Sequence, residues 1–394
     1  MSAPPLLERA AAFFAARGHG FELKPGRARH WRHRARLAVR RDTAGRLAVG
    51  LFQRGTHDVV DIPDCQVHHP AVNEAAQLVR DCLQAGGVEP YNERSGRGQL
   101  RYVQLDVVES DAGAGGGRVR LVLVWNAPGA AAAPGLAPFA ARLWDGDRRG
   151  RHPLLHSILA NYQPARDNTI LGPAFEQLRG PADDAWARLG GAQVCFDAGS
   201  FMQANPEAMG AALEAMKEYV APGASVVDLH AGVGTIGLSL AASRQLSALR
   251  LVEINPAAEA PFWRSWRRLQ AAGAFAAAGP PRVEYHAAAA GSDPARWLAG
   301  ADVAVVDPPR KGLEPQLLRF LCGQGEGEGG GGQVPTPPPR LRRLLYLSCG
   351  YNALERDCLA LLGSGRWALA AARGFLFFPG ADAIETLAVF DRLP

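Results

Sequence analysis

The sequence lacks both a long apolar run and paired cysteines. In its 394 residues an Arg, Asp or Glu interrupts every apolar segment, so none reaches the length of a membrane span. The six cysteines are widely spaced and include no C-x-x-C pair, which argues against an iron–sulfur cluster or a structural zinc site. Scattered cysteines are typical of a reducing compartment. Residues 1–18 lack the apolar core of a signal peptide. We therefore expect a protein that has no membrane-spanning segment and binds no metal.

Acidic residues are scarce near the start of the chain. Between Lys24 and Arg54 there are ten Lys or Arg and a single acid, Asp42, whereas the whole chain has a formal net charge of +5. A basic stripe concentrated in this way fits a polyanionic partner better than a diffuse excess of charge does. A general enrichment in Arg and Ala is the alternative explanation. The stripe thus favours nucleic-acid binding without proving it.

The first half of the chain predicts an α+β domain with mostly antiparallel strands. In residues 30–40 the side chains alternate, which places Arg32, Arg34 and Arg36 on one face of a strand. Such a row can hold a phosphate backbone, or it can simply face solvent on an edge strand. The other predicted elements are an amphipathic helix within residues 1–18, strands at 47–52, 100–108, 118–125, 156–162 and 169–171, and helices at 70–85 and within 128–144.

The pattern changes near Gly190, where strands and helices begin to alternate as in a parallel sheet with crossover helices. We therefore predict two domains, 1–188 and 189–394. The Gly-, Glu- and Pro-rich residues 323–340 are interpreted as a disordered surface insertion. The predicted strands of the second domain are 225–230, 249–253, 301–306, 345–349, 369–378 and 386–390.

A glycine motif indicates a nucleotide-type cofactor. Gly232, Gly234 and Gly237 follow a predicted strand and open a helix, and glycines there let the backbone approach a ligand closely. Glu253 ends the next strand, where its carboxylate can bind ribose hydroxyls. The motif alone does not separate a nicotinamide dinucleotide from S-adenosylmethionine.

Two further strand ends carry reactive groups. Asp307 is followed by Pro308 and Pro309, a rigid turn that fixes a carboxylate at the mouth of the sheet; this favours a nucleobase methyltransferase, although a plain turn is the alternative. Cys349 ends a buried apolar strand. A thiol at the carboxyl edge of a sheet is well placed for nucleophilic chemistry, whereas most free cysteines are inert packing.

Methylation at carbon 5 of a uracil would use these groups together. Carbon 5 is a poor nucleophile until a thiolate adds at carbon 6, and a base must afterwards remove the carbon-5 proton. Glu385, at the start of the last predicted strand, is the candidate base, and Asp382 is the rival. A charged residue in this position is otherwise commonly just exposed.

Taken together, these motifs resemble those of RNA uracil-5 methyltransferases. Five motifs occur in the order of that family: Ser200-Phe201-Met202-Gln203-Ala204-Asn205-Pro206, Asp228 to Gly237, Asp307 to Leu313, Ser348-Cys349, and Glu385. The first half is more loosely similar to the branch that modifies large-subunit ribosomal RNA. The similar segments are Trp31 to Arg36, Gly50 to Phe52, Pro90 to Asn92 and Gly98 to Tyr102.

The resemblance implies a class I, Rossmann-like S-adenosylmethionine-dependent methyltransferase domain after an RNA-binding α+β domain. It implies that Cys349 is the nucleophile and Glu385 the proton acceptor. The implied cofactor residues are Gln203, His230, Gly232, Gly234, Glu253 and Asp307, with Asp307 also near the target base and Arg32, Arg34 and Arg36 on the RNA. The family usually has Tyr or Phe in place of His230, and Asn-Pro in place of Gly350-Tyr351.

We therefore predict an enzyme that methylates carbon 5 of a uridine in ribosomal or transfer RNA through a covalent cysteine intermediate. The alternatives are an exocyclic-amine nucleobase methyltransferase, an RNA-binding protein with a decayed site, and, more distantly, a nicotinamide-dependent oxidoreductase. We expect a monomer with RNA as its partner. The expected location is the cytoplasm, or a chloroplast or mitochondrion in a eukaryote.

Overall fold

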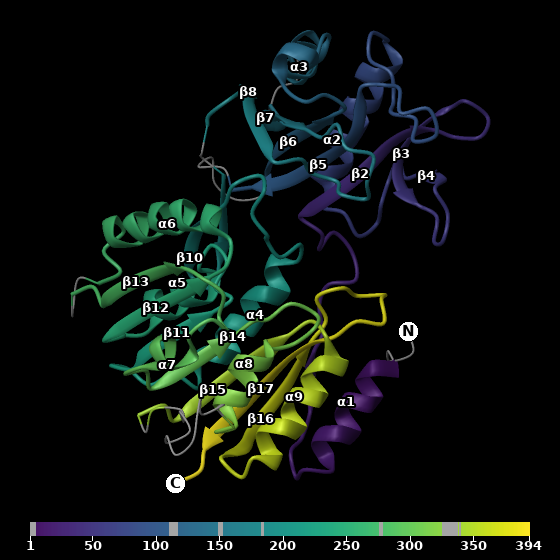
Figure 1. Cartoon of the computed structure of the whole chain (residues 1–394). Helices are drawn as coiled ribbons and strands as arrows, with labels where there is room; N and C mark the ends of the chain where they lie inside the picture. The colour runs from purple at the N-terminus through teal and green to yellow at the C-terminus, as the bar shows by residue number, and fades with distance from the viewer. Residues whose placement is uncertain are drawn as a thin grey trace, which may run out of the picture. The chain divides into compact units, whose positions relative to one another are not determined.

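In the computed structural model the chain forms two compact units, each built on its own large sheet (Figure 1). The structure describes residues 5–109, 117–148, 153–182, 185–275, 279–324, 338 and 340–394. The larger unit comprises Met1–Arg27, Arg188–Phe196 and Pro206–Pro394, and the smaller unit comprises Ala28–Ala187 and Asp197–Asn205. Most of the predicted disordered insertion, 323–340, lies outside the described residues.

This division differs from the predicted boundary at 188/189 in two places. The start of the chain belongs to the larger unit because β1 (Glu22–Lys24) pairs with β16 (Trp367–Phe375), while α1 (Pro5–Ala15) buries Phe14 in that unit's core. Residues 197–205 belong to the smaller unit, where the His33 N–H donates to the Ala204 carbonyl. Both differences from the predicted boundary arise from contacts between distant segments. Such contacts leave no local pattern in the sequence.

The smaller unit is α+β, as predicted. Its sheet has the order β4-β3-β2-β5-β6-β7-β8, antiparallel throughout except for the parallel pair β6–β7. Apolar residues of α2 and α3 share one core with the sheet. The elements are β2 Arg34–Arg41, β3 Leu47–Phe52, β4 Val59–Asp61, α2 Pro70–Gln84, β5 Leu100–Val108, β6 Arg118–Trp125, α3 Leu136–Asp147, β7 Leu155–Tyr162 and β8 Ala174–Arg179.

One predicted strand of this unit is wrong. Residues 169–171 form no strand, and the next strand is β8. The reason is the Asn161 side chain, which accepts a hydrogen bond from the Gly172 N–H and donates one to the Gly172 carbonyl, both at 2.8 Å. Because a side chain satisfies these backbone groups, the segment turns here instead of joining a ladder.

The larger unit has the predicted doubly wound, Rossmann-like α/β fold. Its sheet has the order β1-β16-β17-β15-β14-β11-β12-β13, in which β17 runs against both of its neighbours. The remaining elements are α4 Pro206–Lys217, β11 Ser225–Leu229, α5 Thr235–Ser243, β12 Ala248–Glu253, α6 Glu259–Ala271, β13 Arg282–Ala287, α7 Pro294–Leu298, β14 Val303–Val306, α8 Pro315–Leu321, β15 Arg343–Ser348, α9 Tyr351–Gly363 and β17 Glu385–Arg392. Separately, β9 (Trp186–Leu189) pairs with β10 (Ala192–Cys195).

The strand order reverses at β11, with β12 on one side of it and β14 on the other. Ligands of open α/β sheets bind at the carboxyl ends of the strands at such a switch point. Because β17 runs in the opposite direction, its first residue, Glu385, lies at the same edge as the last residues of β14 and β15. The topology therefore directs the reactive strand ends to one place.

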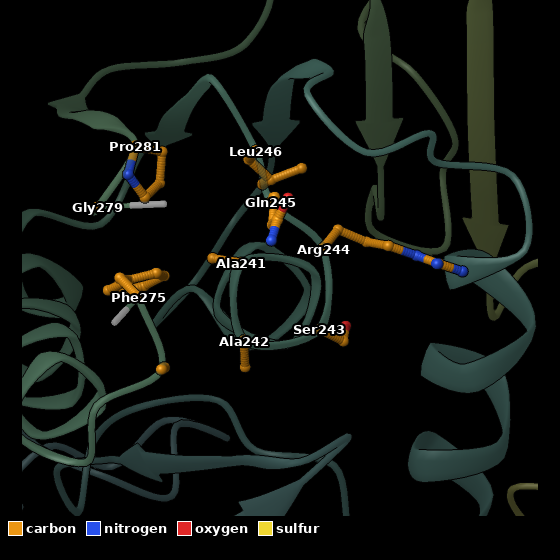
Figure 2. A pocket seen from close by; sticks show the side chains of 10 residues that line it. Ala241, Ala242, Ser243, Arg244, Gln245, Leu246, Phe275, Gly279 and Pro281 are labelled. Atoms are coloured by element: carbon orange, nitrogen blue, oxygen red, sulfur yellow. The ribbon is translucent and has the colours of Figure 1, made fainter. Parts of the chain in front are cut away.

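A pocket of about 120 Å³ lies at the opposite edge, between the end of α5 and the start of β12 (Figure 2). Arg244 and Phe275 are among the residues that line it. It faces away from the carboxyl ends of the strands, so it takes no part in the site described below. None of the helices in the described ranges has the length and apolar character needed to cross a membrane.

Candidate active site

Side chains from five neighbouring strands meet at the carboxyl edge of the larger sheet. They are Asp228 on β11, Glu253 on β12, Asp307 after β14, Cys349 after β15 and Glu385 on β17. The antiparallel register of β15 and β17 pairs Ser348 with Thr386. Cys349 directly follows Ser348 and Glu385 directly precedes Thr386, so the predicted nucleophile and base both adjoin the last pair of this ladder.

The glycine turn between β11 and α5 has backbone geometry that suits a bound ligand. Gly232 and Gly234 have φ values of +54° and +82°, which favour glycine. A Cβ atom on Gly234 would lie 2.5 Å from the Phe262 ring, whereas one on Gly232 would meet no atom within 4 Å. Gly234 is therefore required by packing, and Gly232 leaves its backbone open to a ligand.

Glu253 fixes this turn from the next strand. One of its oxygens, Oε2, accepts from the Gly232 N–H at 2.9 Å, and the other accepts from the Asn255 N–H at 2.8 Å. The Tyr285 hydroxyl, on β13, donates to the Gly232 carbonyl at 2.9 Å. Burial, followed by the charge of Glu253, raises the pKa of Tyr285, so it stays a donor. The sequence analysis missed Tyr285, because nothing near it forms a motif.

His230 lies in the left-handed region, with φ +62°, a strained conformation for a residue other than glycine. Its Nε2 hydrogen-bonds to Oε2 of Glu314 at 2.8 Å. Burial acts to raise the pKa of Glu314, but the bond and charge of His230 lower it below its ordinary value. The imidazole of this chain is thus engaged with a carboxylate. Glu314 stands one residue past the Asp307 motif and was not predicted.

Asp228 is fully buried and Asp307 is half-buried, and the pKa of each carboxyl group is raised. Burial raises the pKa of Asp228 to about 8, although the Gly237 N–H, 2.9 Å from its Oδ2, opposes the shift. Burial likewise raises the pKa of Asp307 to about 7, against the charge of His230. The other oxygen of Asp228, Oδ1, is buried and has no hydrogen-bond partner among the described residues. The site therefore contains a buried carboxyl oxygen that a ligand could contact.

The reactive pair shares one electrostatic environment. Burial, followed by the charges of Glu385 and Asp307, raises the pKa of the Cys349 thiol, and Arg310 acts to lower it. Glu385 is 2% exposed; burial and then Asp307 raise its pKa well above the ordinary range. At neutral pH the resting thiol is therefore protonated, and it faces carboxyl groups with unusually high proton affinity. Such an arrangement suits proton transfer.

Arg310 also explains why glycine follows the cysteine. A Cβ atom on Gly350 would lie 2.5 Å from the Arg310 carbonyl oxygen and 3.0 Å from its Cα. The turn after β14 and the start of α9 therefore touch through backbone atoms. This contact brings the Arg310 side chain to the thiol. The sequence contained Arg310 within the Asp-Pro-Pro-Arg motif, but gave no reason to assign it a role.

Gly350→Ala is expected to lower activity by about 10²-fold, because the added methyl group must displace either Cys349 or the turn that holds Asp307. The measurement is the single-turnover rate of methyl transfer. Gly363→Ala, in the same helix, is the matched control, since its Cβ would meet no atom within 4 Å. Equal rates for the two variants would contradict the expectation.

The three arginines of the predicted RNA-binding row differ in their exposure. Strand β2 begins at Arg34, whose Nε forms an ion pair with Asp106 Oδ1 at 2.8 Å and whose Nη1 donates to the Ser200 carbonyl. Arg34 thus holds the interior of the smaller unit, which corrects its prediction as an RNA contact. Arg32 is half-buried and donates to the Arg34 carbonyl, so only Arg36 is well exposed.

Gln203, predicted at the cofactor, belongs to the segment that folds with the smaller unit. The other predicted cofactor residues, His230, Gly232, Gly234, Glu253 and Asp307, all lie at the switch point of the larger unit. Among the residues that the structure describes, no cluster of three or more His, Cys, Asp or Glu side chains could hold a metal ion.

Comparisons with known proteins agree with this fold. No protein-family model matches the chain. The chain is 32% identical over 370 residues to an uncharacterized RNA methyltransferase of Protochlamydia amoebophila, covering 94% of this chain and 88% of that protein. It is 28% identical to an uncharacterized RNA methyltransferase of Enterococcus faecalis, covering 92% of this chain and 71% of that protein.

The fold also matches a solved structure. The tRNA (uracil-54, C5)-methyltransferase of Pyrococcus abyssi, solved with S-adenosyl-L-homocysteine, superposes with a TM-score of 0.69 at 20% identity, covering 98% of this chain and 82% of that chain. This likeness establishes the shared fold, and the 32% identity to the Protochlamydia protein establishes the family. The chain belongs to the family of RNA methyltransferases that its motifs indicated.

Proposed function

We propose that this RNA methyltransferase acts on carbon 5 of a uridine, through a covalent bond between Cys349 and carbon 6 of the base. The observation that carries the proposal is that Cys349 and Glu385 directly adjoin Ser348 and Thr386, the last pair of the β15–β17 ladder, with the charge of Glu385 acting on the thiol. Asp307, after the neighbouring strand β14, raises the pKa of both groups, so all three lie within electrostatic reach. Amine methylation needs no thiol opposite a carboxylate.

The residues would act in sequence. The Cys349 thiol loses its proton to a neighbouring carboxylate, and the thiolate adds to carbon 6, which moves electrons through carbon 5 into the carbonyl at carbon 4. After carbon 5 has been methylated, Glu385 removes the carbon-5 proton. The electrons of that C–H bond restore the double bond between carbons 5 and 6, and the bond from sulfur to carbon 6 breaks. Cys349 is released unchanged.

S-adenosylmethionine fits the switch point. Its ribose hydroxyls are suited to Glu253, and the open backbone at Gly232 leaves room for a ligand where a side chain would otherwise stand. The unpartnered Asp228 oxygen offers a further buried acceptor. When bound, S-adenosylmethionine supplies the electrophilic methyl group. His230, Gly234 and Asp307 complete the proposed cofactor residues of the larger unit, and Gln203, in the smaller unit, stays a prediction.

The RNA substrate is proposed to be ribosomal or transfer RNA. A base inside a helix hides carbon 6, so the target uridine must leave its stack to reach Cys349. Asp307 is proposed to contact this base as well as the cofactor. The basic stripe remains the proposed contact to the RNA backbone, with Arg36 as its exposed member on β2. The Pyrococcus protein is named for a tRNA uridine, which keeps transfer RNA among the candidates.

The test is a trapping assay with wild-type protein, S-adenosylmethionine and total RNA in which uridine is replaced by 5-fluorouridine. Fluorine cannot leave carbon 5 as a cation, so the adduct with Cys349 should persist on a denaturing gel, and sequencing the trapped RNA would identify the target. Cofactor binding without an adduct would indicate amine methylation instead. Loss of both would indicate a decayed site.

A further inference from the structure

We propose that residues 5–24, here called the N-terminal brace, position the nucleophile relative to the base, and that Arg9 is the main positioning residue. The brace comprises α1, the connection that follows it, and β1. All of its contacts described below lie within the larger unit. The inference rests on the proposed carbon-5 chemistry, because it concerns the spacing of Cys349 and Glu385.

The first contact of the brace is with the chain just after the cysteine. The Arg9 guanidinium lies 5.5 Å from the centre of the Tyr351 ring, and its Nη1 donates to Asn352 Oδ1 at 2.8 Å. Arg9 also forms an ion pair with Glu355, one turn further along α9. Tyr351 is the first residue of α9, is buried, and stands two residues after Cys349. Arg9 therefore holds the segment that carries the thiol.

The second contact is with the loop before the base. The Leu6 N–H, in the first turn of α1, donates to Asp382 Oδ1 at 3.2 Å. Asp382 precedes Glu385 by three residues, and Ile384 between them belongs to the same core cluster as Phe14. One helix thus touches both of the chain segments that supply the reactive pair.

The third contact comes from β1, which extends the sheet beside the base. Lys24 pairs with Phe375 on β16, and Phe375 in turn pairs with Glu385 on β17. The Lys24 carbonyl accepts from the Leu376 N–H at 3.2 Å. The end of the brace is therefore one strand away from the carboxylate.

The brace is firmly packed between these contacts. Phe14 is fully buried and stacks on Phe21, with ring centres 5.1 Å apart and planes 12° apart. Figure 1 shows α1 beside α9, and the two helices are in contact. A rigid element that contacts both segments can transmit position from one to the other.

Spacing matters here because the two reactive groups leave the sheet on different segments. Cys349 lies at the end of β15, and Glu385 follows a loop that enters β17 from the other direction. A misplacement of about 1 Å between reacting groups can cost about 10²-fold in rate.

The test compares Arg9→Met with wild-type protein. Methionine keeps an aliphatic stem and removes the guanidinium. We expect the single-turnover rate of adduct formation on 5-fluorouridine RNA to fall about tenfold or more, with the KM for RNA and the Kd for S-adenosylhomocysteine unchanged. Tyr351→Ala should slow the reaction similarly. The rate loss of the double variant should be smaller than the product of the two single losses, because the two changes share one interaction.

Three further variants sharpen the test. Arg9→Lys should restore part of the rate. Leu6→Pro, tolerated in the first turn of a helix, removes the N–H that bonds Asp382 and should slow the reaction without unfolding α1. The matched control is Arg282→Ala, an exposed arginine whose 2.6 Å ion pair with Glu284 lies at the start of β13. It should react at the wild-type rate.

The inference is overturned if Arg9→Met and Leu6→Pro form the adduct as fast as wild-type protein. It is also overturned if their rate losses merely follow losses of cofactor binding and thermal stability, since that pattern marks general destabilisation. Failure of the underlying function looks different. In that case wild-type protein itself forms no adduct, so the rates of the variants cannot be compared with it.

Discussion

Cys349→Ala is expected to abolish methyl transfer, lowering the single-turnover rate on the order of 10⁴-fold or more. The reason is chemical, because carbon 5 of uracil does not attack a methyl group until a nucleophile has added at carbon 6. The adduct with 5-fluorouridine RNA should disappear as well. The Kd for S-adenosylhomocysteine should stay within about twofold, since the proposed cofactor contacts lie on β11, β12 and β14.

The matched control is Cys82→Ala, which removes a half-buried thiol from α2 and should leave the rate unchanged. Methyl transfer that survives in Cys349→Ala would refute the covalent mechanism. The Asp307-Pro308-Pro309 turn would then be interpreted as the site of an exocyclic-amine methyltransferase, which needs no thiol.

Glu385→Gln is expected to separate adduct formation from release. The amide cannot accept the carbon-5 proton, so turnover should fall by about 10²–10⁴-fold. Addition of Cys349 to carbon 6 does not need that step. The covalent complex should therefore accumulate on ordinary uridine RNA, where wild-type protein passes through it. A denaturing gel with unmodified RNA and S-adenosylmethionine measures this directly.

The same substitution should shift the pH dependence of adduct formation. In wild-type protein the rate should rise with pH, because burial, Glu385 and Asp307 hold the pKa of the Cys349 thiol above its ordinary value of 9.0. Removing the Glu385 charge lowers this pKa, so the thiolate forms at lower pH. The rising limb should therefore move to lower pH in Glu385→Gln, as measured by single-turnover adduct formation from pH 6 to 10.

Glu284→Gln makes the same chemical change in a surface pair with Arg250 and should leave both the turnover and the pH profile unaltered. The assignment of the base fails if Glu385→Gln turns over normally. In that event Asp382, the rival in the same loop, becomes the candidate, and Asp382→Asn should show the accumulation instead.

Local patterns in the sequence were enough to predict the fold of the larger unit, and they predict that its reactive side chains gather at one sheet edge. Strands that end in Glu253, Asp307 and Cys349, with a glycine turn after β11, are enough to place these residues at one sheet edge, because parallel strands share their carboxyl ends. The helix at the start of the chain was predicted as well, since its apolar spacing is local.

Contacts between distant segments were decided only by the tertiary structure. The alternation of side chains along residues 30–40 predicts that Arg34 is exposed. In the structure Arg34 instead forms a buried ion pair with Asp106 on a neighbouring strand. Glu314 and Arg310 acquire their partners, His230 and Cys349, only when β11, β14 and β15 lie side by side.

The N-terminal brace is the clearest example of contacts that local sequence patterns do not predict. Arg9 and Tyr351 are separated by more than three hundred residues and meet on neighbouring helices. Hydrophobic periodicity records which face of a helix is buried, but it carries no information on which segment will cover that face. The sequence therefore determined the family and the fold and predicts the reactive groups, whereas the contacts that surround those groups are decided by the tertiary structure.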